Sequence, residues 1–103
     1  MDSLNNHQCG VANTIRVIGS KWSMLILHNI FEGKTRFGQL QKELSSISPK
    51  TLSLRLKELE KEKLVQRKIL AEVPLHVEYS LTPKGKSLQK IFDDMASWGS
   101  NNS

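Results

Sequence analysis

The sequence predicts a mainly α-helical domain with a small β-hairpin (α+β), and three observations support this fold class. Two amphipathic helix patterns, joined by a short Ser-rich turn, occupy residues 36–61. Two short strand patterns follow in residues 65–81. The chain is also basic, with 15 Lys and Arg residues against 10 Asp and Glu and a formal net charge of +5. This order of elements is typical of a winged helix-turn-helix, and the charge favours an anionic partner such as nucleic acid.

The chain length of 103 residues corresponds to a single domain, which we place at residues 7–99, with frayed tails at residues 1–6 and 100–103. Only 38% of the residues are hydrophobic, so we expect a homodimer to cover part of the apolar surface. No segment approaches the roughly 20 apolar residues that cross a bilayer. The start of the chain is polar and lacks the apolar segment of a secretion signal. We therefore expect a cytoplasmic protein with no membrane partner.

Cysteine and histidine are too few and too scattered to predict a metal site. Cys9 is the only cysteine, so an internal disulfide is impossible and a Cys-based zinc site is not expected. The three histidines, His7, His28 and His76, lie far apart without ligand spacing. The sequence predicts neither a metal nor another cofactor.

The N-terminal part of the domain is predicted to form two helices. Apolar residues from Val11 to Ile18 predict a short helix that ends at Gly19, where a left-handed residue costs little. The second helix, over residues 21–31, is apolar around most of its girth, as expected of a central core helix. Gly33 ends this second helix.

The helix-turn-helix is predicted over residues 37–61. Apolar residues line one face of its first helix at helical spacing, beginning with Phe37. Ser48 supplies an N-cap side chain and Pro49 a first helical residue for the second helix. In that helix the inward positions are taken by leucines, namely Leu52, Leu56 and Leu59. The opposite face, which carries several lysines, is therefore predicted to point away from the core.

This outward face is the candidate DNA-binding surface, because a recognition helix needs small or polar side chains near its N-terminus and basic residues within reach of phosphates. Lys50 and Thr51 are candidates for base-edge contact, and Leu54 could touch a thymine methyl group. Arg55 either reaches a phosphate or pairs with a neighbouring Glu. The alternative for the whole set is an ordinary solvated helix face. The candidates on this helix are Ser48, Lys50, Thr51, Ser53, Leu54, Arg55 and Lys57.

Apolar and polar residues alternate from Leu75 to Leu81, which predicts a strand with one buried side. Residues 65–70 are its predicted partner, and residues 71–74 form the tip of the wing. Basic residues on both sides of this tip suit phosphate or minor-groove contact. The alternative is solubilising charge on an edge strand. These residues are Arg67, Lys68 and His76.

Thr82 and Pro83 repeat the cap-and-proline signal and predict a last helix with a wide apolar stripe. The domain core can cover part of this stripe, and a partner subunit the rest. Together with the first helix, the stripe defines the predicted dimer surface, which consists of Val11, Ile15, Ile18, Ile91, Phe92, Met95 and Trp98.

Several motifs resemble the HxlR-type family of bacterial winged-helix regulators, within the wider MarR-like class. They are Cys9, GSKW (residues 19–22), GKTRF (33–37), LSLRLKELE (52–60), LVQR (64–67) and VEYSLTPKG (77–85). The resemblance implies a transcription factor that binds double-stranded DNA as a homodimer on an inverted repeat, with the first and last helices forming the dimer. Two positions depart from the family pattern: Ser20 replaces the second glycine, and Gly10 replaces a proline after the cysteine.

Cys9 is a candidate redox sensor. We expect it to precede the first helix, where the positive end of the helix dipole would favour the reactive thiolate. Several members of the resembled family use the corresponding cysteine to sense oxidants or electrophiles. The alternative is a small buried packing residue.

Three other functions compete with DNA binding. An enzyme is not expected, because the sequence contains no Gly-rich phosphate loop and no recognisable nucleophile with its base. A winged helix can instead serve as a protein–protein interaction module without DNA affinity. RNA binding would require exposed aromatic residues that stack on unpaired bases, and these are not evident.

Overall fold

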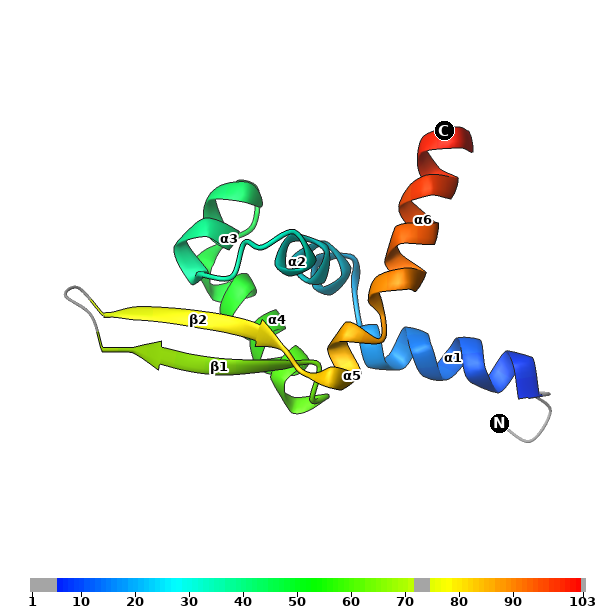
Figure 1. Cartoon of the computed structure of the whole chain (residues 1–103), viewed down its shortest axis with the longest axis horizontal. Helices are drawn as coiled ribbons and strands as arrows, with labels where there is room; N and C mark the ends of the chain where they lie inside the picture. Colours follow the sequence, from blue (N-terminus) through cyan, green and yellow to red (C-terminus); the bar gives the residue numbers. More distant parts are fainter. Residues whose placement is uncertain (1–5, 72–74, 103) are drawn as a thin grey trace.

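The computed structural model describes residues 6–71 and 75–102, and it confirms the predicted winged helix-turn-helix (Figure 1). The helix-turn-helix consists of α3 and α4, and the antiparallel hairpin β1–β2 forms the wing beside them. The elements in chain order are α1 (Asn6–Ile18), α2 (Lys21–Phe31), α3 (Phe37–Glu43), α4 (Pro49–Lys61), β1 (Val65–Leu70), β2 (His76–Leu81), α5 (Pro83–Lys86) and α6 (Gln89–Asn102).

The hydrophobic core lies between α2, the helix-turn-helix and the base of the wing. The α4 leucines predicted to point inward are almost completely buried, with Leu52 and Leu56 at 0% exposure. They meet the α2 residues Ile26 and Leu27, which are also fully buried, and Leu40 of α3. The helix α2 therefore occupies the predicted central position.

Serine side chains cap the N-termini of α4 and α2. The Ser48 hydroxyl accepts a hydrogen bond from the Thr51 amide at 3.1 Å, and Pro49 is the first residue of α4, as predicted. Ser20, which stands where the resembled family has glycine, caps α2 by accepting from the Ser23 amide at 3.2 Å. The serine therefore suits this turn, since the backbone there is extended.

The helix boundaries differ from the predictions at both ends of the chain. The helix α1 begins at Asn6 rather than near Val11, and α6 continues to Asn102, so residues 100–102 are helical and not a frayed tail. The Asn102 side chain donates to the Trp98 carbonyl at 2.9 Å and supports this last turn. These end residues are polar, so apolar spacing, the signal used for prediction, does not detect them.

The predicted last helix is divided into α5 and α6. Thr82 caps α5 by accepting from the Gly85 amide at 3.0 Å, and the Thr82 amide donates to the Leu64 carbonyl at 3.0 Å, which fastens this short helix to the base of the wing. The chain then bends, so that Phe92 of α6 packs edge-to-face on Phe31 of α2, with ring centroids 5.3 Å apart. Two anchoring contacts in different directions explain why one continuous helix does not form.

The wing pairs β1 with β2 from Val65 opposite Leu81 to Leu70 opposite His76. A further connection was not predicted: the Tyr79 amide donates to the Thr35 carbonyl at 2.8 Å, and Arg36 forms a β-bridge with Glu78. The segment before α3 therefore holds the outer edge of β2.

One detail of the predicted wing is corrected, and another lies outside the described residues. Leu75 precedes β2 and is 70% exposed, and within β2 the buried residue is Tyr79, at 6% exposure. Most of the predicted tip, residues 72–74, lies outside the described residues. Within the described ranges, none of the helices has the length and apolar character that a bilayer span requires.

Gly85 provides a test of how α5 packs. A Cβ at this position would overlap the Leu64 carbonyl oxygen and lie 3.1 Å from its carbonyl carbon, and this carbonyl already accepts from the Thr82 amide. We expect Gly85→Ala to lower the free energy of unfolding by about 1–3 kcal/mol in urea titrations. Gly38→Ala in α3 is the matched control, because its Cβ would meet nothing within 4 Å. Equal unfolding midpoints for the two variants would contradict this packing.

Candidate nucleic-acid interface

The face of α4 opposite the leucines is uncovered in the chain. Lys50, Ser53 and Lys57 are exposed on this face, and Leu54 is 52% exposed. These residues are exposed because every third or fourth residue of α4 is buried in the core, and the helical period then directs the residues of the opposite face outward. The outward direction predicted for these residues is confirmed.

The hydroxyl groups of Ser48 and Thr51, at the N-terminus of α4, differ in their hydrogen bonds. The Ser48 hydroxyl donates to the Thr51 hydroxyl at 2.9 Å while it accepts from the Thr51 amide. Ser48 therefore acts as the helix cap. Thr51 keeps the proton of its own hydroxyl, which remains able to donate to an acceptor outside the helix.

Arg55 adopts the second of its two predicted alternatives. Its Nη1 atom donates to Oε1 of Glu58 at 2.8 Å, one turn further along α4. The Nε atom is buried and has no hydrogen-bond partner among the described residues. In the free chain the Glu58 carboxylate thus holds the guanidinium along the helix.

The basic residues of the wing lie on opposite faces of the hairpin, which corrects the predicted basic strand pair. Directly opposed residues of an antiparallel pair share one face of a sheet. Arg67 is opposite Tyr79 and faces α4, whereas Lys68 is opposite Glu78 on the outer face. His76, opposite Leu70, shares that outer face. Strand alternation separates neighbours such as Arg67 and Lys68, a consequence that the prediction overlooked.

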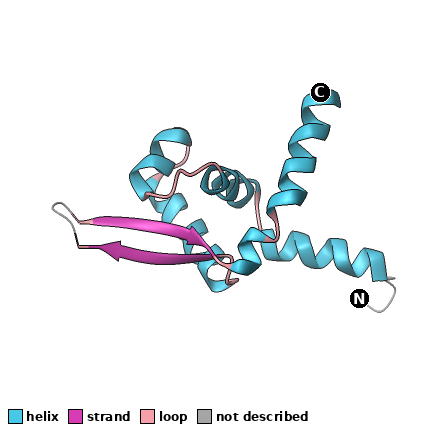
Figure 2. Ribbon diagram, in the orientation of Figure 1, coloured by secondary structure: helices cyan, strands magenta, loops and turns pink. Residues whose placement is uncertain are grey.

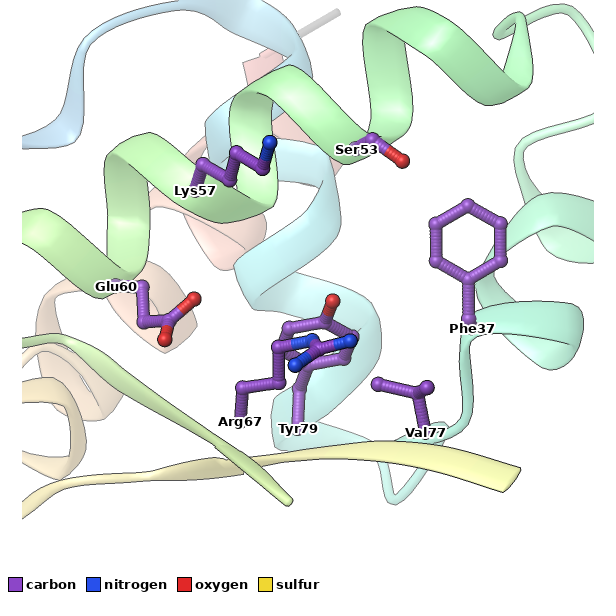
Figure 3. Close-up of a pocket in the computed structure, with 7 residues that line it drawn as sticks. All are labelled: Phe37, Ser53, Lys57, Glu60, Arg67, Val77 and Tyr79. Carbon is purple, nitrogen blue, oxygen red and sulfur yellow. The ribbon is translucent and has the colours of Figure 1, made fainter. Parts of the chain in front are cut away.

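A cleft forms between α4 and the wing, and it brings together residues from distant parts of the sequence (Figure 3). We call it the α4–wing cleft. Its volume is about 480 Å³, and Lys57 of α4 and Arg67 of β1 both line it. Glu60 contributes the opposite charge. The full lining is Phe37, Ser53, Lys57, Glu60, Arg67, Val77 and Tyr79.

The sequence predicted Lys57, Arg67 and Ser53 as site residues, but it did not predict the other walls of this cleft. Phe37 was assigned to the core face of α3 and Tyr79 to the buried face of the strand, yet both side chains also border the cleft. Glu60 was not singled out at all. The strand register places Tyr79 opposite Arg67 and would have shown that these two side chains share a face. The register could not be predicted from the sequence, because apolar and polar residues alternate poorly in residues 65–70.

The predicted dimer surface divides into an exposed part and a buried part. The side chains of Val11, Ile15 and Trp98 are between 62% and 70% exposed, and Ile91 and Met95 are nearly half exposed. Ile18 and Phe92 are 7% and 6% exposed and belong to the core of the chain itself, so the assignment of Phe92 to the dimer surface is corrected, whereas Ile18 still borders the groove between α1 and α6. Both lie at the base of their helices, where α1 and α6 join the domain.

The exposed part surrounds a groove between the two terminal helices. In Figure 2 these helices project from the body of the domain on the side away from the strands of the wing. The groove has a volume of about 540 Å³, and mainly apolar side chains line it, among them Val11, Ile15, Met24, Ile91 and Met95.

Cys9 lies inside α1 and not before it, because the helix begins three residues earlier, at Asn6. Its side chain is exposed in the single chain, so a packing role would require a partner subunit to cover it. Across the described residues, no three side chains of His, Cys, Asp or Glu gather as a metal site would require.

Comparisons with known proteins agree with this architecture. The model of the HxlR-like helix-turn-helix family matches residues 17–103. YodB, an HTH-type transcriptional regulator of Bacillus subtilis (strain 168), is 38% identical over 96 residues, which cover 92% of this chain and 86% of YodB. The resemblance inferred from the motifs is thereby confirmed.

Solved structures of redox regulators are similar in fold. The reduced form of HypR matches with a TM-score of 0.84 and 39% identity, over 90% of this chain and 92% of the HypR chain. The oxidised form of HypR matches with a TM-score of 0.85 and 39% identity, over 92% and 98% of the two chains.

Diamide-treated YodB from B. subtilis matches with a TM-score of 0.72 and 34% identity, over 97% of this chain and 96% of the YodB chain. The family model matches most of the chain, and the relatives are transcriptional regulators. The structure adds a helix-turn-helix with a wing. The chain belongs to the HxlR-like helix-turn-helix family and is a winged helix-turn-helix transcriptional regulator.

Proposed function

We propose that the protein binds double-stranded DNA sequence-specifically, as a homodimer on an inverted-repeat operator, with α4 in the major groove and the wing beside it. The observation that carries this proposal is the uncovered basic face of α4, which continues into the α4–wing cleft. A winged helix that served only as a protein-binding module would not require two cations at the junction of helix and wing.

In this proposal some residues of α4 contact bases and others stabilise the helix. Lys50 and Thr51 lie in the first turn and read base edges, and Leu54 contacts a thymine methyl group one turn later. Ser53 is small enough to let the helix backbone approach the groove. Ser48 and Arg55 support the helix, through the cap and the Glu58 pair respectively.

The α4–wing cleft receives the sugar–phosphate backbone. A strand that passes from the major groove to the neighbouring minor groove must cross the space between the recognition helix and the wing. Lys57 and Arg67 border this space from two sides and neutralise a phosphate there. Lys68 and His76, on the outer face of the wing, contact more distant phosphates. These contacts set position and affinity rather than sequence preference.

The exposed apolar residues of α1 and α6 form the dimer contact. A twofold dimer places two copies of α4 on half-sites about one helical turn apart, roughly 34–36 Å between centres. Burial of the groove between α1 and α6 removes apolar surface that a monomer would leave in water.

Fluorescence anisotropy with labelled promoter duplexes tests the DNA proposal. We expect Arg67→Ala to weaken binding to the operator and to unrelated duplex alike, and to reduce the salt slope of log affinity by about 1.8, because each subunit of the dimer loses one phosphate contact worth about 0.9. Lys68→Ala removes the same charge from the outer face of the wing and is the matched control, with a smaller loss. Equal losses for the two variants would refute the role of the cleft. Negligible affinity of the wild type at physiological salt would favour the protein-binding module.

Sedimentation velocity tests the dimer. The wild type is expected to show a molar mass of twice the 11.7 kDa of one chain. The Ile15→Glu variant is expected to show the mass of one chain, because its carboxylate would be buried in the dimer contact. Ile69→Glu is the control, since Ile69 is 55% exposed but lies on the wing. A dimeric Ile15→Glu variant would exclude this surface.

We also infer that Cys9 makes DNA binding responsive to thiol oxidants. The support is its exposure on α1, next to the proposed dimer contact, and the similarity to HypR and YodB, which are described in oxidised or diamide-treated forms. Oxidation of a single thiol leads to a disulfide with the second subunit, a mixed disulfide with a small thiol, or a sulfenic acid.

Diamide treatment followed by a non-reducing gel, intact-mass spectrometry and the anisotropy assay tests this inference. The wild type is expected to form a covalent dimer or an adduct and to change its operator affinity at least several-fold, and Cys9→Ser is expected to do neither. Modification of the wild type without any change in affinity would show that Cys9 is reactive but not a sensor.

A further inference from the structure

We propose that Gln39 of α3 is a positioning residue for DNA binding, because it fixes the wing relative to α4 and thereby sets where Arg67 meets a phosphate. The effect on DNA rests on the proposed function. The structural link between Gln39 and the wing does not depend on it.

The side chain of Gln39 reaches back over the start of α3. Its Oε1 atom accepts a hydrogen bond from the Arg36 amide at 3.1 Å and another from the Thr35 amide at 3.2 Å. A carbonyl oxygen has two lone pairs and can serve two donors at once. Thr35 and Arg36 are also the residues that pair with β2. A single side chain of the helix-turn-helix therefore holds the backbone segment to which the wing is attached.

The wing is attached to this segment through its own backbone. The Thr35 carbonyl accepts from the Tyr79 amide at 2.8 Å, and Arg36 forms a β-bridge with Glu78. Tyr79 lies opposite Arg67 in the hairpin, so a displacement of the segment reaches Arg67 through one cross-strand pair. The opposite wall of the cleft would stay in place, because the buried leucines fix α4 in the core.

The start of α3 has no hydroxyl cap, in contrast to α2, α4 and α5, where Ser20, Ser48 and Thr82 accept from helix amides. Arg36 occupies the N-cap position of α3, and a guanidinium has donors but no acceptor. The acceptor at this end is supplied by Gln39, from the third position of the helix. Loss of its oxygen would release the start of α3 from the segment that holds β2.

The competing role for Gln39 is a direct contact with the DNA backbone, since its side chain is exposed. The two roles differ in two measurable respects. Gln39 is uncharged, so loss of a direct contact would leave the salt slope unchanged, whereas loss of positioning would remove the phosphate contact of Arg67 and lower the slope. A direct contact would also add to the effect of an Arg67 substitution, whereas positioning acts through Arg67 and would not.

Hydrogen exchange of the Tyr79 amide, measured by NMR on the full chain without DNA, tests the structural link. Gln39→Met keeps the length of the side chain and removes the acceptor, and we expect exchange at least about threefold faster, because the bond to Thr35 opens more often. Gln39→Glu retains an acceptor oxygen and should keep the slow exchange. Gln66→Met, on the outer face of the wing opposite Ser80, is the matched control. Unchanged exchange in Gln39→Met would overturn the link.

Fluorescence anisotropy with the operator tests the effect on DNA. Gln39→Met is expected to weaken binding about threefold to tenfold and to lower the salt slope toward that of Arg67→Ala, whereas Gln66→Met should change neither. In a chain that already carries Arg67→Ala, Gln39→Met should cause no further loss. An equal loss in both backgrounds, or an unchanged salt slope, would overturn the positioning role and indicate direct contact. Failure of the wild type to bind DNA would instead count against the proposed function and leave the exchange experiment to decide the link.

Discussion

The burial of the α4 leucines against α2 is the constraint on which the rest of the structure depends. Leu52 and Leu56 have no exposed surface, so a rotation of α4 about its axis would remove apolar side chains from the core and create cavities there. With that rotation fixed, each position between the leucines has a defined direction. Lys50 and Lys57 face outward for this reason and not because of any contact that they make themselves.

The wing depends on a second set of constraints, which are backbone hydrogen bonds. The bond from the Tyr79 amide to the Thr35 carbonyl and the bridge between Arg36 and Glu78 tie β2 to the start of α3, and Thr82 ties the base of the hairpin to α5. The hairpin therefore has a defined position relative to α4. Its alternation then decides that Arg67, and not Lys68, completes the α4–wing cleft.

The terminal helices carry a separate part of the surface but remain connected to the recognition helix. Arg16 of α1 pairs with Glu62, the C-cap of α4, at 3.4 Å, and Lys84 of α5 donates to the Glu62 carbonyl at 2.8 Å. The end of α4 thus contacts both the helix that carries Cys9 and the helix that leads into α6. These contacts join α1 and α5 to the C-terminal end of the recognition helix.

The sequence by itself determined the element order, the inner and outer faces of α4 and the helix starts at Ser48 and Thr82, because helical periodicity and caps act over a few neighbouring residues. The tertiary structure alone decided the rest. It buried Phe92 against Phe31, divided the last helix and joined Lys57 to Arg67 with aromatic walls in one cleft. These features depend on strand register and on the angles at which separate elements meet, and local patterns contain no information about either.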